Sequence, residues 1–139
     1  MTLQNIPIIA VIPARGGSKG IPLKNMKKIN NKPLIFYTIN AAIKSKYIDK
    51  IYVTSDNKSI LNYCNKFKLS CIKRPKFLSK DKTTAVDVLK HTIKYIDKSI
   101  LKQNPYIIYL QPTSPLRTYI HIDKLILSVK NRREKNILS

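Results

Sequence analysis

The chain has 139 residues, of which 43% are hydrophobic, and this predicts a single domain with one core rather than several domains. Lys and Arg number 27 against 7 Asp and Glu, which gives a formal net charge of +20. Such an excess favours an anionic partner such as nucleic acid, a membrane surface or a phosphorylated metabolite. Because the lysines are spread through every segment, compositional bias is an alternative explanation for most of the charge.

The apolar segments are short. The amino-terminal run stops at Arg15 after about nine apolar residues, and no run approaches the roughly 20 residues of a membrane-spanning helix. Cys64 and Cys71 lack the C-x-x-C spacing of a redox or zinc site, so we expect reduced thiols in the core. These features predict a cytoplasmic protein that neither crosses nor binds a membrane.

The first strand is predicted over Ile8–Ala14, where apolar residues follow one another as in a strand that is covered on both faces. The next segment, 15–25, holds all three glycines of the chain. A helix is predicted from Pro33, a residue suited to the first helical turn. Its apolar stripe is expected to consist of Leu34, Tyr37, Ala41 and Ile43.

Residues 50–56 predict a second strand, after which Ser55 and Asp56 can cap the next helix. We interpret Asp56 as this cap rather than as a catalytic acid. The apolar stripe of the helix is expected to consist of Ile60, Leu61, Cys64 and Phe67. A weaker third strand is predicted over 70–74.

Residues 83–100 predict one amphipathic helix, capped by Thr83 or Thr84. Its apolar stripe is expected to consist of Val86, Leu89, Ile93 and Ile96. Asp87 and His91 lie one turn apart on it, a spacing that is more typical of a hydrogen bond than of a metal site.

The last predicted elements are a buried strand over 106–111, a loop, a helix over 122–129 and the opening of a further strand at 134–139. Strands therefore alternate with helices, which predicts an α/β fold of the Rossmann-like kind, a parallel sheet with helices on both faces. Ligands bind such sheets at the carboxyl ends of the strands. The loops at 13–25, 54–57, 74–84 and 111–118 are therefore the candidate site.

The glycine-containing loop has the composition of a phosphate site. Glycine lets backbone N–H groups approach phosphate oxygens, and Arg15, Lys19 and Lys24 supply positive charge. Its spacing matches neither G-x-x-x-x-G-K-[ST] nor G-x-G-x-x-G, which disfavours a P-loop kinase or a dehydrogenase. A solvated turn is the alternative, and the position directly after the first buried strand favours the site.

Four separated stretches carry a more specific signal. They are "IPARGGSKGIPLKN" at 12–25, "NKPLIFYTINAAIKSKYIDKIYVTSD" at 31–56, "RP" at 74–75 and "LQPTSPLRT" at 110–118. In this order the stretches resemble the acylneuraminate cytidylyltransferases, the synthetases of CMP-sialic acid and its legionaminic and pseudaminic relatives. The resemblance implies the fold of the nucleotide-diphospho-sugar transferases. It also implies attack of a nine-carbon 2-keto acid on the α-phosphorus of CTP, with magnesium assisting and pyrophosphate released.

The resemblance assigns roles to particular residues. Catalysis of phosphoryl transfer is mainly alignment and charge stabilisation, and the implied catalytic cations are Arg15, Lys19 and Lys24. The implied CTP-binding residues are Ala14, Arg15, Gly17, Ser18, Lys19, Lys24, Asn25, Arg74, Thr83 and Thr84. The implied sugar-binding residues are Gln111, Thr113, Ser114 and Arg117.

Simpler interpretations stand beside two of these assignments. Arg74 can be a solvated arginine before a proline, and Gln111 can satisfy backbone groups at the end of a strand. Ala85 stands where the family commonly has a serine, which leaves the details of base recognition open.

Members of the resembled family continue further, through a dimerisation segment, sugar-binding residues and a pair of aspartates for magnesium. We therefore expect 1–139 to be the CTP-binding part of a longer homodimeric domain, with its metal ligands unassigned. The expected partners are CTP and an acidic nine-carbon sugar, without nucleic acid. Two alternatives remain open: an inactive remnant that binds CTP at most, and a basic nucleic-acid-binding module.

Overall fold

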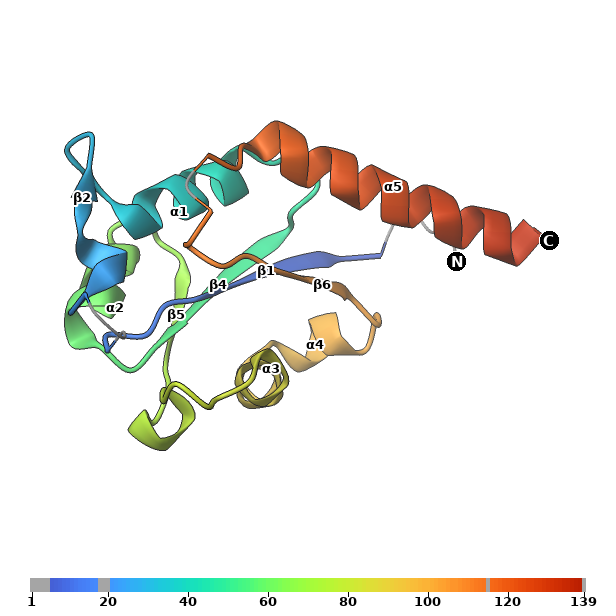
Figure 1. The fold of residues 1–139 in the computed structure, drawn as a ribbon. Helices are drawn as coiled ribbons and strands as arrows, with labels where there is room; N and C mark the ends of the chain where they lie inside the picture. Colours follow the sequence, from blue (N-terminus) through green and yellow to red (C-terminus); the bar gives the residue numbers. More distant parts are fainter. Residues whose placement is uncertain (1–5, 18–20, 115, 139) are drawn as a thin grey trace.

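The computed structural model describes residues 6–17, 21–114 and 116–138, and it shows a four-stranded parallel sheet between two layers of helices (Figure 1). The strand order is β5-β4-β1-β6. The bounds are Ile8–Pro13 for β1, Lys50–Ser55 for β4, Ser70–Lys73 for β5 and Tyr106–Tyr109 for β6. The predicted Rossmann-like α/β fold is confirmed.

β1 is the centre of the sheet, because it pairs in parallel with β4 on one side and with β6 on the other. Its side chains alternate between two cores: Ile8, Ala10 and Ile12 join one cluster, and Ile9 and Val11 join the other. Every residue from Ile8 to Ile12 is buried, since helices cover both faces of the strand. This is why the segment reads as an uninterrupted apolar run.

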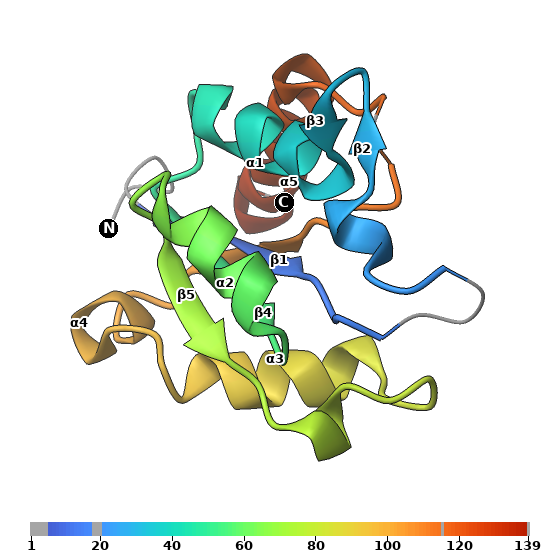
Figure 2. The ribbon, with the colours of Figure 1, turned by 90° about the vertical axis from the view of Figure 1, so that its left-hand side faces the viewer.

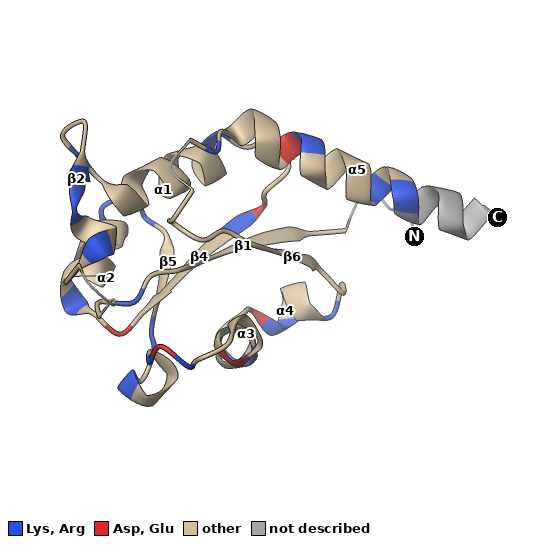
Figure 3. Cartoon of the chain, viewed as in Figure 1, with Lys and Arg blue, Asp and Glu red and all other residues tan. Residues whose placement is uncertain are grey.

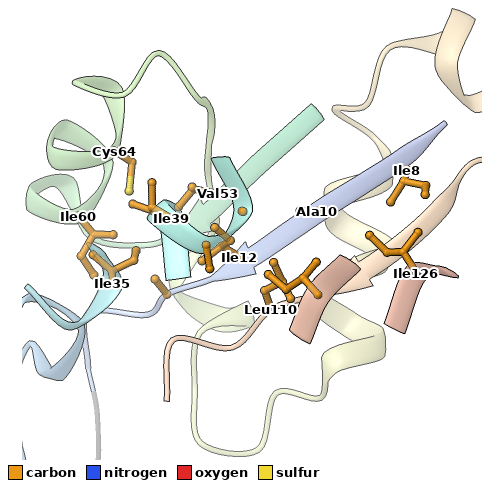
Figure 4. Close-up of a cluster of buried hydrophobic side chains, with 14 residues drawn as sticks. Ile8, Ala10, Ile12, Ile35, Ile39, Val53, Ile60, Cys64, Leu110 and Ile126 are labelled. Carbon is orange, nitrogen blue, oxygen red and sulfur yellow. The ribbon is translucent and has the colours of Figure 1, made fainter. Parts of the chain in front are cut away.

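The larger core lies against α1 (Leu34–Lys44), α2 (Lys58–Asn65) and α5 (Tyr119–Leu138). Figure 4 shows it, with labels on Ile8, Ala10, Ile12, Ile35, Ile39, Val53, Ile60, Cys64, Leu110 and Ile126. The smaller core lies on the opposite face, where α3 (Ala85–Ile93) and α4 (Lys98–Leu101) cover the sheet (Figure 2). Its buried members are Ile9, Val11, Tyr52, Ile72 and Ile96.

Two predicted apolar stripes differ from the buried faces. On α1 the predicted Leu34 and Ala41 are buried, but Ile35, Thr38 and Ile39 are buried as well, whereas Ile43 is 48% exposed. On α3 Val86 and Ile93 are exposed and the buried positions include His91 and Thr92. Polar side chains thus occupy part of the inward face, and Thr92 Oγ1 satisfies itself by donating to the Val88 carbonyl at 2.8 Å.

The predicted helix over 83–100 is two helices. Thr84 caps α3 as expected: its hydroxyl accepts from Asp87 N–H at 3.1 Å, and the Asp87 carboxylate accepts from Thr84 N–H at 3.2 Å. Asp87 therefore caps the helix and does not make the expected hydrogen bond with His91. The centroid of the His91 ring lies 5.1 Å from the centroid of the Tyr95 ring. The chain leaves the helix after Ile93 and α4 begins at Lys98.

α5 is longer than predicted, since it runs from Tyr119 to Leu138 and includes the segment expected to open a strand. Its carboxylate at Asp123 is buried and accepts hydrogen bonds from Ser45 Oγ and Lys46 N–H. These contacts fix the start of α5 beside the end of α1. Among the described residues, no helix is both long enough and apolar enough to cross a membrane.

Two short elements were not predicted. β2 (Lys28–Ile29) and β3 (Lys32–Pro33) form a small antiparallel hairpin before α1. Its turn residues Asn30 and Asn31 both have positive φ, 50° and 67°, the arrangement that a two-residue hairpin requires and that asparagine tolerates. Two 3-10 turns, η2 (Lys24–Met26) and η3 (Lys76–Leu78), lie in the loops.

The two isoleucines Ile39 and Ile43 provide a matched test of this core, because they lie one turn apart on α1. Ile39→Ala should lower the free energy of unfolding by about 2 to 5 kcal/mol, since it leaves a cavity at a fully buried position. Ile43→Ala should cost much less, because that side chain is 48% exposed. Urea denaturation measures both, and equal losses would contradict the packing of α1.

Both cysteines are free, with Cys64 buried and Cys71 half-buried. Burial raises the pKa of Cys64 to about 12 and raises the pKa of Cys71. A raised pKa leaves a thiolate fraction at Cys64 of about one in ten thousand at pH 8. Cys64 should therefore resist iodoacetamide at pH 8 until the chain is denatured, as mass spectrometry would show; rapid labelling of the folded chain would contradict its burial.

Candidate functional site

A pocket of about 330 Å³ lies at the carboxyl ends of the parallel strands. It is lined by Pro13, Arg15, Lys24, Asn25, Arg74, Lys80, Asp81, Thr83, Val88, Tyr109, Gln111, Pro112 and Thr113. The predicted loops at 13–25, 74–84 and 111–118 all contribute to it, whereas the predicted loop at 54–57 has no residue in this lining. The parallel sheet brings them together because β1, β5 and β6 end at the same edge.

The segment after β1 is held by backbone and side-chain contacts. Ala14 N–H donates to the Thr54 carbonyl at 2.9 Å, Leu23 N–H donates to the Gly16 carbonyl at 3.1 Å, and Asn25 Nδ2 donates to the Arg15 carbonyl at 3.0 Å. The chain therefore returns on itself and places Lys24 and Asn25 beside Arg15. Ser18 and Lys19, two of the predicted phosphate ligands, lie outside the described residues.

Asp56 has a different role from the predicted helix cap. Asn57 is the residue that caps α2, where its Oδ1 accepts from Ile60 N–H at 3.1 Å. Asp56 Oδ1 instead accepts from Gly16 N–H at 2.8 Å. The carboxylate thereby positions the glycine-containing loop, and the observed cap, Asn57, lies one residue after the cap that the sequence predicted.

The two described glycines of this loop have different surroundings. A Cβ on Gly16 would lie 2.7 Å from Asn57 Cβ, so only glycine fits between the loop and the start of α2. A Cβ on Gly17 would meet no atom within 4 Å. Packing explains the first glycine, whereas the open backbone at the second is free to be approached by a ligand.

Arg74 lies at the wall of the pocket and is only 4% exposed, so the solvated alternative is wrong. Its Nη1 donates to the Leu78 carbonyl at 2.8 Å, its Nη2 lies 3.4 Å from the Thr54 carbonyl, and its buried Nε has no protein partner among the described residues. Burial lowers the pKa of Arg74, and the nearby Tyr109 and Asp56 oppose that shift. A buried guanidinium with spare donor capacity suits an anionic or polar ligand.

The lining carries an excess of positive charge. Four described lining residues are cations, Arg15, Lys24, Arg74 and Lys80, whereas one, Asp81, carries a carboxylate. Asp81 and Lys80 were missed by sequence reasoning, which flagged the loop 74–84 but assigned no role to them. An acidic residue between lysines in a candidate loop was the available signal.

The remaining predicted residues are divided between three places. Gln111, Thr113 and Thr83 line the pocket, whereas Thr84 is exposed and uses its hydroxyl to cap α3. Ser114 is exposed and is not among the lining residues. Arg117 donates to the Gln111 carbonyl at 2.8 Å and lines a separate cavity with residues of α1. Their roles in binding stay predictions.

Comparison of the sequence with known protein families shows which family the chain belongs to. A family model described as cytidylyltransferase matches residues 9–139, nearly the whole chain. The chain belongs to the cytidylyltransferase family. The resemblance that the sequence motifs predicted is thereby confirmed.

Curated relatives of this cytidylyltransferase chain include an N-acylneuraminate cytidylyltransferase of Streptococcus agalactiae serotype V, 38% identical over 133 residues, or 94% of this chain and 31% of the relative. A CMP-N,N'-diacetyllegionaminic acid synthase of Legionella pneumophila is 36% identical over 115 residues, or 79% of this chain and 47% of the relative. The chain thus spans less than half the length of either relative.

A solved structure of CMP:2-keto-3-deoxy-manno-octonic acid synthetase complexed with CTP matches the fold with a TM-score of 0.74. Its sequence is 20% identical, and the match covers 90% of this chain and 48% of that one. At this identity the comparison supports the fold of the cytidylyltransferase chain and nothing finer.

The described part of the chain does not fit a protein-built magnesium site. It contains no group of three or more His, Cys, Asp or Glu side chains that could hold a metal ion. The two carboxylates nearest the glycine-containing loop are already engaged, Asp81 with Arg15 and Asp56 with Gly16 N–H. Magnesium needs hard oxygen ligands, so these residues alone do not supply its coordination.

The two described glycines of the glycine-containing loop should respond differently to substitution. Gly16→Ala should lower the free energy of unfolding by about 1 to 3 kcal/mol, because the added methyl overpacks the contact with Asn57. Gly17→Ala, the control, should change it by no more than about 0.5 kcal/mol, because the added methyl meets open space. Urea titration of both variants checks this, and a larger loss for Gly17→Ala would show that the loop packs differently.

Proposed function

We propose that this chain forms the CTP-binding part of a cytidylyltransferase that joins CMP to a nine-carbon 2-keto acid sugar of the sialic or legionaminic type and releases pyrophosphate. The observation that carries the proposal is the pocket at the strand ends, which four cations line. The backbone at Gly17, two residues after the lining Arg15, is sterically open. The names of the curated relatives support the choice of nucleotide and of sugar class.

The pocket residues suit the charge of a triphosphate. Arg15 and Lys24 lie on the pocket wall after β1 and would neutralise phosphate oxygens, with Lys19 as a further predicted cation. Arg74 is held in place by backbone carbonyls, so it would present its charge without reorganising. The exposed Gly17 lets the backbone approach a phosphate without steric hindrance. Together these groups would align the α-phosphorus and stabilise the charge that develops there.

The sugar would enter from the side of the pocket that follows β6. Gln111 and Thr113 line this side and carry hydrogen-bonding groups. The Gln111 side chain is exposed, and Arg117 holds its backbone carbonyl. Gln111 therefore has a fixed backbone and an available amide, which suits contact with a polyhydroxylated acid.

CTP binding without turnover is the second candidate function. It is favoured by the lack of a carboxylate cluster for a metal among the described residues. A nucleic-acid-binding surface is less well supported, because basic residues occur in both helical layers and in the loops rather than on one face (Figure 3).

CTP binding can be tested by calorimetry with a matched pair of lysine variants. Lys24→Gln should weaken CTP binding about 10- to 100-fold, the effect of losing a hydrogen bond between charged groups. Lys102→Gln removes the same charge from an exposed position between α4 and β6, outside the pocket lining, and should leave the affinity unchanged. Equal weakening would indicate unspecific attraction, and absence of CTP binding by the unmodified chain would refute the nucleotide site.

Turnover needs a separate measurement. Incubation with CTP, magnesium and a panel of nine-carbon keto acids should release pyrophosphate with a sialic or legionaminic acid. Thermal stabilisation by CTP without pyrophosphate release would support the binding-only alternative.

A further inference from the structure

The pocket contains an ion pair between its two main loops. Arg15 Nη1 lies 2.6 Å from Asp81 Oδ1, and the two residues are 66 positions apart in the sequence. Both line the pocket, with side chains that are 30% and 53% exposed. The pair therefore lies on the wall of the pocket, within reach of a ligand.

Both partners are held by their own loops. Lys80 N–H donates to Thr83 Oγ1 at 3.1 Å and Thr83 N–H donates to the Lys80 carbonyl at 3.0 Å, which closes a turn around Asp81. On the other side, Asn25 Nδ2 donates to the Arg15 carbonyl at 3.0 Å. The backbone geometry of the two loops thus directs the carboxylate toward the guanidinium.

The proposed function gives Arg15 a second anionic partner. The guanidinium N–H that Asp81 accepts is the kind of donor that a phosphate oxygen would use. A carboxylate on the pocket wall would also repel a bound triphosphate, and Asp81 is the one acid among the described lining residues. The two anions therefore compete for Arg15.

We propose that Asp81 pairs with Arg15 in place of a phosphate group and is displaced when a polyphosphate binds, so that Asp81 sets the affinity of the pocket for the polyphosphate part of its ligand. This inference rests on the proposed function, because it takes Arg15 as a phosphate ligand. A ligand without phosphate leaves the pair intact. Departure of pyrophosphate lets the pair form again, which favours release of that product.

The test compares Asp81→Asn with Asp97→Asn. Asp97 makes a similar exposed pair, 2.8 Å from Lys50 Nζ, and it is not among the pocket-lining residues. Both substitutions remove one negative charge and one ion pair, so the control separates the local effect from the change in net charge. Calorimetry then gives the affinities of both variants for CTP, inorganic pyrophosphate and cytidine.

Asp81→Asn should bind CTP and pyrophosphate about two- to fivefold more tightly than the unmodified chain, the range expected when an exposed ion pair no longer has to be broken. Cytidine binding should not change, and Asp97→Asn should behave like the unmodified chain. Weaker CTP and pyrophosphate binding by Asp81→Asn would overturn the inference and indicate that Asp81 instead orients Arg15, and unchanged binding would also overturn it. The same gain in Asp97→Asn would also overturn it.

A second arm uses Arg15→Gln as the background. The gain from Asp81→Asn should be smaller there, because the competition for Arg15 has been removed; an equal gain would mean that Asp81 acts by charge repulsion alone and would overturn displacement. If the unmodified chain binds pyrophosphate but not CTP, the proposed function fails while the pyrophosphate comparison still decides the inference. If it binds neither, both fail.

Discussion

The structure depends on the burial of β1 on both faces. Because Ile8, Ala10 and Ile12 pack into one core while Ile9 and Val11 pack into the other, the strand has a fixed position between two layers of helices. Its end at Pro13 is therefore fixed as well, and the chain can leave the sheet only at the edge where the neighbouring strands also end. The glycine-containing loop begins at that point. The packing that buries β1 in the core therefore also positions the loop that lines the pocket.

The loop is positioned from α2 as much as from β1. Asp56 and Asn57 follow β4, and together they hold Gly16: the carboxylate accepts from its N–H, and the Asn57 side chain leaves no room for a Cβ. Asn57 also caps α2. Asp56 and Asn57 thus join the start of α2 to the glycine-containing loop. This contact explains why glycine is required at position 16, whereas the backbone at Gly17 stays open to a ligand.

Patterns in the sequence predicted the strands well and the helical faces less well. β1 was clear because burial on both faces produces an uninterrupted apolar run. Half of the stripe predicted for 83–100 was right, since Leu89 and Ile96 pack in the smaller core. Val86 and Ile93 were wrong, because they face solvent while His91 and Thr92 face inward. Thr92 tolerates burial because its hydroxyl donates to a carbonyl of its own helix, which hydrophobic periodicity does not reveal. The hairpin at 28–33 was missed, although the adjacent Asn30 and Asn31 are typical of a turn with two positive φ angles.

The sequence by itself determined the fold class, the family and the three loops that line the pocket, because strand burial, glycine placement and motif order are local properties of the chain. The fourth predicted loop, 54–57, does not line it. Only the tertiary structure decided which residues of those loops meet. In the structure Arg74 is buried, and Asp56 binds Gly16 N–H instead of capping a helix. Arg117 lines a separate cavity, and Arg15 forms an ion pair with Asp81. These contacts join residues up to 66 positions apart, and their geometry is set by how the strands and helices pack, which no local pattern encodes.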